Sequence, residues 1–129
     1  MAERYPDDLL YHPEHDWARV DGDQATFGVT WYAQDALGEV VFFDPPAVGA
    51  SVVANESYAE VESVKAVSDV FAPLSGTIVA VNERLAGAPE KVNDDPYDEG
   101  WMVKVELSDR SEIESLLDVG AYMDLLSKS

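Results

Sequence analysis

The sequence SYAEVESVKAVSDVFAPLSGTIVAV spans residues 57–81 and is rich in β-branched and small side chains. It predicts one strand over residues 57–64 and another over 67–72, with Lys65 and Ala66 near the turn between them. The residues Pro-Leu-Ser-Gly at 73–76 predict a further turn, and residues 77–81 predict a third strand. This stretch therefore indicates a β fold in which one lysine lies at the tip of a hairpin.

The residues near the N-terminus predict a second hairpin and a short helix. Residues 16–29 form two strand-like runs around Asp21-Gly22, a pair that favours a tight turn with positive φ. Thr30 is predicted to cap a helix over residues 31–37, and Gly38 is predicted to end it in a left-handed conformation.

The other strands are predicted from apolar runs. Residues 39–43 predict a buried strand that ends before Pro45-Pro46, and residues 48–53 predict another turn and strand. Residues 86–100 predict a long polar loop, and residues 101–107 alternate at period two, as a half-buried strand does.

The C-terminal segment changes to the apolar spacing of helices. One helix is predicted to begin at Asp109 or Ser111 and to end at Gly120, and a second short helix follows it. Short strands with peripheral helices predict a sandwich or barrel, and a length of 129 residues suits one domain, 1–129. The apolar positions that indicate the two helices are Ile113, Leu116, Leu117, Tyr122, Leu125 and Leu126.

The charge of the chain is strongly negative, with 26 acidic and 8 basic residues and a formal net charge of −18. Because like charges repel, this balance argues against partners that are nucleic acids or anionic membranes. An acidic surface of the kind that keeps proteins soluble accounts for the charge, and steering towards basic partner surfaces is the functional alternative.

The residues offer little catalytic apparatus. With no cysteine, the chain has no disulfides, thiolate metal sites or cysteine nucleophile. The segment from His12 to Asp16 has two histidines and two acids, but a surface segment leading into a strand is the favoured interpretation over a metal site. The N-terminus is acidic without an apolar signal core, and no apolar run approaches the roughly 20 residues that cross a bilayer, which favours a cytoplasmic protein of a prokaryote.

The chain has four lysines, and Lys65 is one of them. It lies in the run Glu62-Ser63-Val64-Lys65-Ala66-Val67-Ser68-Asp69. Taken alone, a lysine at a turn is usually only solvated. The run resembles the lipoylation segment of the glycine cleavage system H protein family, and the similarity continues through residues 72–76 and 81–83. Residues 11–17, 33–42 and 92–102 resemble further blocks of that family in the same order, so the resemblance covers about residues 9–126.

The resemblance implies a mainly β, lipoyl-type barrel-sandwich hybrid of two small antiparallel sheets with short peripheral and C-terminal helices. It implies that lipoic acid is joined to Lys65 as an amide, by a lipoate ligase or a lipoyl/octanoyl transferase. The implied function is a non-catalytic carrier that shuttles an aminomethyl group from a pyridoxal-phosphate glycine decarboxylase (P protein) to a folate-dependent aminomethyltransferase (T protein). A dihydrolipoyl dehydrogenase (L protein) then reoxidises the dithiol, because the cofactor rather than the protein does the chemistry.

The resemblance also implies roles for other residues. Glu14, Asp16 and Asp69 are candidates for holding the loaded arm, whose amine is cationic. Glu60 and Glu62 flank the hairpin and are candidates for ligase recognition. Ser63, Val64 and Ala66 adjoin the lysine and are candidates for ligase recognition or arm docking, since the small Ser63 and Ala66 let the ligase approach. Trp31 and Ala36 depart from the family, in which a histidine is common at the Ala36 position.

Other readings remain at this point. Lipoyl domains of 2-oxoacid dehydrogenases place Asp before the lysine and biotin carriers flank it with methionines, whereas Val64 and Ala66 flank it here. A paralogue used for lipoyl relay, an unmodified acidic interaction module and a self-sufficient enzyme are the further alternatives.

Overall fold

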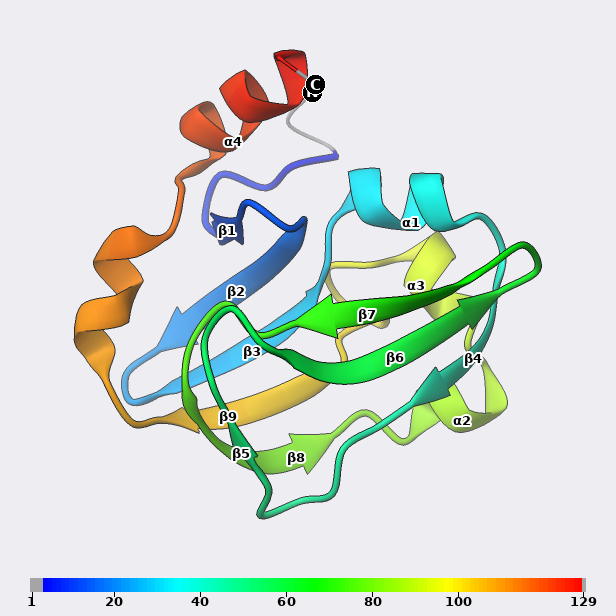
Figure 1. The fold of residues 1–129 in the computed structure, drawn as a ribbon, viewed down its shortest axis with the longest axis horizontal. Coiled ribbons are helices and arrows are strands. Elements are labelled where there is room, and N and C mark those ends of the chain that lie inside the picture. Colours follow the sequence, from blue (N-terminus) through cyan, green and yellow to red (C-terminus); the bar gives the residue numbers. More distant parts are fainter. Residues whose placement is uncertain (1–3, 129) are drawn as a thin grey trace.

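A computed structural model describes residues 4–128, and within them the strands form two antiparallel sheets. The larger sheet has the order β1 (Leu10–His12), β2 (Asp16–Asp21), β3 (Gln24–Val29), β9 (Val103–Leu107), β8 (Gly76–Val81) and β5 (Ser51–Val52). The smaller sheet has the order β4 (Val40–Asp44), β6 (Ser57–Ser63) and β7 (Val67–Phe71). The prediction of two antiparallel sheets is confirmed, and the strands of residues 4–128 do not close into a barrel (Figure 1).

The core lies between the two sheets. Phe27, Ile78 and Val105 of the larger sheet belong to the same buried cluster as Val61 and Val70 of the smaller sheet. Alternation along β6 buries Ala59, Val61 and Ser63 and exposes the residues between them, because successive side chains of a strand point to opposite faces.

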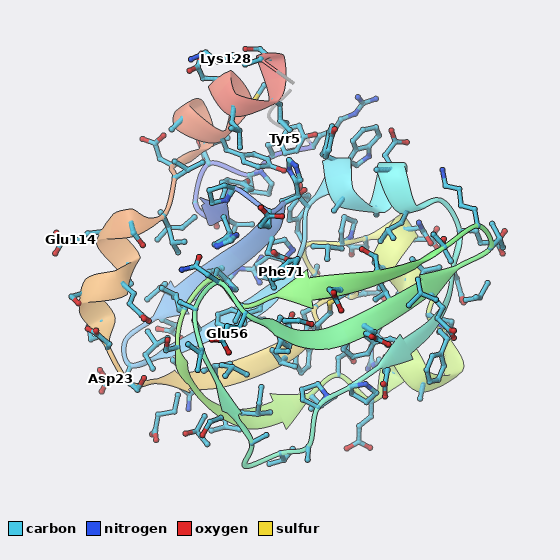
Figure 2. All side chains as sticks on the ribbon, viewed as in Figure 1. Tyr5, Asp23, Glu56, Phe71, Glu114 and Lys128 are labelled. Atoms are coloured by element: carbon cyan, nitrogen blue, oxygen red, sulfur yellow. The ribbon has the colours of Figure 1, made fainter. Side chains whose placement is uncertain are left out.

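Short helices lie at the edges of this sandwich. They are α1 (Trp31–Leu37), α2 (Arg84–Gly87), α3 (Lys91–Asp94), a 3₁₀ helix (Arg110–Ser115) and α4 (Val119–Ser127). The α4 helix lies beside β1 (Figure 1), where Tyr122 stacks on Tyr11 with ring centroids 4.7 Å apart. No helix of the described residues is long and apolar enough to cross a membrane. Acidic side chains such as Asp23 and Glu114 project from the periphery (Figure 2).

The two hairpins and α1 agree with their predictions. Asp21 pairs with Gln24 across a turn in which Gly22 has φ 63°. The Thr30 side chain accepts a hydrogen bond from the backbone N–H of Ala33, and Gly38 ends α1 with φ 82°. Because a left-handed φ costs little only for glycine, Gly38 is the residue that lets the chain turn towards β4.

The predicted buried strand over residues 39–43 is wrong in part. Val41 and Phe42 are 47% and 48% exposed, since a β-bulge between Val40 and Phe42 shifts the register against β6. An apolar run predicts a strand, but only Val40 and Phe43 of this run face the core.

The predicted loop over residues 86–100 is also wrong in part, because it contains α3 and the end of α2. Its polar side chains make structural contacts: Asn93 accepts a hydrogen bond from Val40 N and donates to Gly38 O, both over 2.8 Å. The indole of Trp17 donates to Pro96 O over 3.0 Å. The segment therefore fixes the junction between α1 and β4.

The predicted helix boundaries at the C-terminus need correction. The first helix is a 3₁₀ helix that begins after Asp109 and ends before Leu116, and Leu117 instead forms a β-bridge with Tyr11. Gly120 does not end a helix, because Asp118 caps α4 by accepting from Ala121 N and so places Gly120 in its first turn. The predicted second helix is confirmed as α4, and its Tyr122 side chain is buried.

Candidate functional site

Lys65 lies in the turn between β6 and β7, which Ser63 closes. The backbone N–H of Ser63 donates to Ala66 O over 2.8 Å. The Ser63 hydroxyl accepts from Lys65 N at 3.3 Å and from Ala66 N at 3.1 Å. These bonds satisfy the backbone donors of a turn whose two central residues are Val64 and Lys65. The turn therefore presents Lys65 from a fixed backbone.

A neighbouring segment supports the outer end of this turn. The N–H of Val64 donates to Glu39 O over 3.0 Å, which joins the turn to the junction after α1 (Figure 1). The Lys65 stem lies over Gly38, where an added Cβ would meet Lys65 Cε at 3.1 Å. Lys65 is exposed, and its ammonium group is in none of the ion pairs found within residues 4–128.

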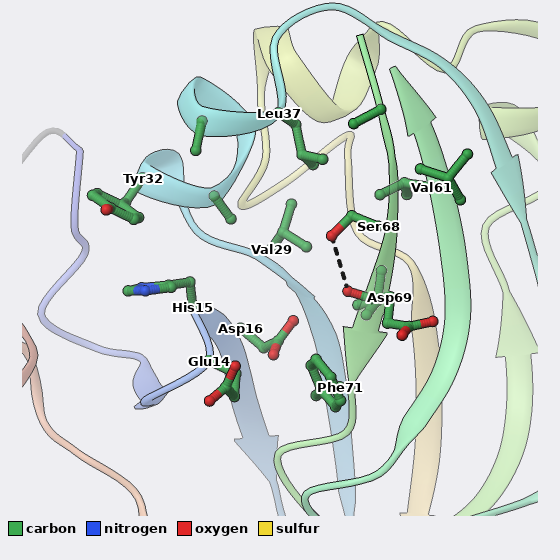
Figure 3. A pocket seen from close by; sticks show the side chains of 15 residues that line it. Glu14, His15, Asp16, Val29, Tyr32, Leu37, Val61, Ser68, Asp69 and Phe71 are labelled. Carbon is green, nitrogen blue, oxygen red and sulfur yellow. Dashed lines mark hydrogen bonds between the residues drawn. The ribbon is translucent and has the colours of Figure 1, made fainter. Parts of the chain in front are cut away.

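A cavity of about 390 Å³ begins beside this turn. Its walls are residues 66–71, the helix α1 and the entry to β2 (Figure 3). Apolar side chains form much of the lining, and they include Val29, Ala33, Ala36, Leu37, Val61 and Val70. A flexible chain attached at Lys65 thus has an adjoining, mostly apolar space to enter.

Asp16 supplies a buried acid to this cavity. The residue is 2% exposed, and its Oδ2 atom has no hydrogen-bond partner among the described residues. Burial, with a smaller contribution from the Glu14 carboxylate, raises the pKa of Asp16 well above its ordinary value, although the backbone N–H of Phe71 opposes the rise. A cation in the cavity would give the orphaned oxygen a partner.

His15 connects the cavity to the C-terminal helix. Its ring lies 4.4 Å from that of Tyr32, and its Nδ1 is 2.8 Å from the hydroxyl of Tyr122. The same hydroxyl lies 2.8 Å from Thr30 Oγ1. Burial lowers the pKa of His15 below its ordinary value, so the neutral ring is favoured at this position.

The structure brings some of the predicted site residues together and separates others. Glu14, Asp16, Ala66 and Asp69 line the cavity, whereas Glu62, Ser63 and Val64 do not. The carboxylate of Asp69 turns to the far side of β7 from Asp16 (Figure 3) and accepts a 3.3 Å hydrogen bond from the Ser57 hydroxyl.

The segment from His12 to Asp16 agrees only in part with the predicted surface segment, because Pro13 and Glu14 are exposed and β2 begins at Asp16. His12 is 5% and Asp16 2% exposed. No group of three or more His, Cys, Asp or Glu side chains in the described part of the chain is arranged to hold a metal ion. Sequence reasoning assigned no role in the site to His15, Tyr32, Gly38 or Asn93, although three of them lie within the blocks that carry the resemblance.

The model of the glycine cleavage H-protein family matches residues 9–129. The chain belongs to this family. A probable glycine cleavage system H protein of Haloarcula marismortui is 53% identical over 124 residues, which cover 96% of this chain and 98% of that one. The glycine cleavage system H protein of Bacillus cytotoxicus is 50% identical over 123 residues, covering 95% and 97%.

A solved structure agrees with this assignment to the glycine cleavage H-protein family. The crystal structure of a glycine cleavage system H protein from Mycobacterium marinum has a TM-score of 0.87 and 38% sequence identity. The match covers 95% of this chain and 98% of that one, so the similarity extends over both sheets and the helices at their edges.

Proposed function

We propose that this protein is the lipoyl-carrying shuttle of a glycine cleavage system and that Lys65 is the point of attachment. Its partners are a glycine decarboxylase, an aminomethyltransferase, a dihydrolipoyl dehydrogenase and the enzyme that lipoylates it. The observation that carries the proposal is the position of an exposed lysine on a hydrogen-bonded turn, directly beside a cavity with a buried acid.

The surroundings of Lys65 fit an amide-linked cofactor. Acylation needs an accessible primary amine, and the Lys65 side chain provides one on a flexible stem above a fixed backbone. Gly38 leaves room for that stem, since any larger residue would contact it. The amide removes the lysine charge and makes the net charge of −18 more negative by one.

The lipoyl group, when bound, supplies the sulfur that carries a one-carbon amine between enzymes. The protein's part is to hold the loaded lipoyl arm in the cavity and to shield its amine from water. Asp16 offers an unpartnered oxygen to a cationic amine, and Glu14 adds a second negative charge at the cavity edge. Asp69 stands at the rim and would serve the same amine only after its side chain turns. Leu37 and Val61 add apolar surface to the wall of the cavity.

The proposal assigns no catalytic step to the chain itself, and it places the protein in the cytoplasm of a prokaryotic cell. Its relatives from an archaeon and from bacteria support that setting. Both sulfurs of the cycle come from the cofactor, so a chain without cysteine suffices.

The test is intact mass and peptide mapping after incubation with lipoate, ATP and a purified lipoate ligase. We expect one lipoyl addition, confined to Lys65, and none in Lys65→Arg, because arginine keeps the charge but cannot form the amide. The matched control is Lys104→Arg, which replaces an exposed lysine in β9, and this variant should be lipoylated at Lys65 as the wild type is. Glycine decarboxylation with a purified glycine decarboxylase should follow the same pattern.

Two outcomes would contradict this assignment. A folded Lys65→Arg variant that still supports glycine decarboxylation would refute Lys65 as the attachment point. Complete lipoylation without any support for glycine decarboxylation would refute the glycine cycle and favour a lipoyl-relay protein.

A further inference from the structure

The outward face of the smaller sheet has an ordered set of side chains. Phe42, Glu62 and Val67 are paired across β4, β6 and β7, and they form one row next to the lysine turn. Asp44, Glu60 and Asp69 are paired in the same way and form the second row. Directly paired residues share a face of a sheet, and all six of these residues are exposed. We call this set the outer face.

The first row is unusually apolar for an exposed surface. Phe42 is 48% and Val67 59% exposed, and Val41 and Val64 beside them are 47% and 66% exposed. These four large apolar side chains lie on β4 and around the lysine turn rather than singly across the molecule. Apolar side chains gathered at one exposed place mark contact sites for other proteins.

The second row is acidic, and no basic side chain on the same strands offsets its negative charge. The strands β4, β6 and β7 contain no lysine or arginine. The corresponding face of the larger sheet differs, because Arg19 and Lys104 flank Thr26 there and adjoin the row of Asp21, Gln24 and Glu106. The acidity of the outer face is therefore a local feature and not only a consequence of the net charge.

We propose that the outer face is the docking surface for the enzyme that acylates Lys65. The occupant is a protein surface with an apolar centre, which covers Phe42 and Val67, and lysine or arginine side chains opposite Asp44 and Glu60. This inference rests on the proposed attachment at Lys65 and goes beyond it, because it names the surface by which the carrier is recognised.

The position of the outer face explains why an acylating enzyme would use it. Such an enzyme must cover the turn at Val64 and Lys65. This turn lies between Glu62 and Val67, two residues of the first row. The cavity borders this face at β7, because its lining includes Ala66, Val67 and Asp69. The outer face continues from the turn across β6 to β4, and its charge attracts a basic partner over a distance.

The test measures kcat/KM for lipoylation by a purified lipoate ligase at about 50 mM and about 500 mM sodium chloride, since salt screens exposed charges. One variant combines Asp44→Lys with Glu60→Lys, and another is Phe42→Thr. Asp69 is left unchanged because it also lines the cavity. The matched controls are Asp21→Lys with Glu106→Lys, and Val79→Thr, which change the same kinds of exposed residue on the larger sheet.

At low salt we expect each outer-face variant to lose about tenfold in kcat/KM, and we expect the controls to stay within about twofold of the wild type. High salt should reduce the difference in kcat/KM between the wild type and the charge variant, and it should leave the loss of kcat/KM in Phe42→Thr unchanged. Thermal unfolding of every variant identifies any loss that comes from misfolding, and Phe42→Tyr replaces Phe42→Thr if the latter is unstable, with a smaller expected loss.

The proposal is overturned if the outer-face variants and their controls are lipoylated equally fast, or if both charge variants slow the ligase alike. Absence of lipoylation in the wild type is a different failure, since it refutes attachment at Lys65 and not the docking surface alone.

Discussion

The imidazole Nδ1 of His15 and the hydroxyl of Tyr122 lie 2.8 Å apart, although 107 positions separate them in the chain. One residue lines the cavity and the other is buried in the C-terminal helix α4. Because Thr30 Oγ1 is 2.8 Å from the same hydroxyl, α4 also contacts the residue that caps α1. The C-terminal helix therefore helps to fix two walls of the cavity.

Tyr122→Phe is expected to destabilise the protein by about 1 to 2 kcal/mol, because both His15 and Thr30 then lose a buried partner. Urea unfolding at neutral pH measures the loss. Tyr58→Phe is the control and should cost less, since the hydrogen bond found for the Tyr58 hydroxyl within residues 4–128 is a 3.7 Å contact with Met102 Sδ. Equal losses of unfolding free energy in the two variants would mean that the contacts of the Tyr122 hydroxyl with His15 and Thr30 add no stability of their own.

Acidification is expected to weaken the fold through His15. Its pKa in the folded protein is below the ordinary value of 6.5 because burial disfavours the charged ring. The unfolded chain then binds the proton more tightly, so stability is lost as the pH falls below about 6.5 and levels off below the folded pKa. The free energy of unfolding of the wild type and of His15→Gln, measured at several pH values, isolates this effect. If the two proteins show the same pH dependence, His15 is not its source.

Much of the fold was predictable because local signals matched the final structure. Asp21-Gly22 between two strand-like runs specified the β2–β3 hairpin, and Thr30 with Gly38 specified both ends of α1. The turn at Lys65 was predicted from the strands on either side of it. In each case the residues that determine the conformation lie within a few positions of one another.

The remaining features depend on contacts that no local pattern contains. Helix α3 has four residues, too few for an apolar period, and Asn93 matters through bonds to Gly38 and Val40. Gly120 resembled a helix stop, but the cap at Asp118 lies before it. Asp16 looks like a surface acid in sequence, and its burial follows only from the packing of β2 against the smaller sheet.

Ser63→Ala is expected to slow lipoylation of Lys65 and to cost about 1 kcal/mol of stability, because the N–H groups of Lys65 and Ala66 lose their side-chain acceptor. Ser63→Thr keeps the hydroxyl and should restore most of the rate. Ser68→Ala is the control, since the hydrogen bond found for that hydroxyl within residues 4–128 is a long one, 3.4 Å to Asp69 O. The measurement is kcat/KM with a purified lipoate ligase, alongside the melting temperature. A Ser63→Ala protein that is lipoylated as fast as Ser68→Ala would show that the turn needs no hydroxyl.

Asp16→Asn is expected to stabilise the protein and to impair it as a carrier. The folded protein holds the Asp16 proton more tightly than the unfolded chain does, so the wild type loses stability as the pH rises through the raised pKa. Asparagine has no charge to bury, and the variant should gain about 1 kcal/mol above that pKa, with no gain where the carboxyl is protonated in both states.

The same change removes the acid that we assign to the cationic amine of the loaded arm, and we expect transfer to the aminomethyltransferase to fall about tenfold or more while lipoylation is unchanged. Glu14→Gln is the matched control for stability, because Glu14 is exposed and its replacement should shift the unfolding free energy by less than about 0.5 kcal/mol. An Asp16→Asn protein that is both more stable and fully active would remove Asp16 from the function. A less stable one would contradict the unpartnered state of the Asp16 Oδ2 atom in the structure.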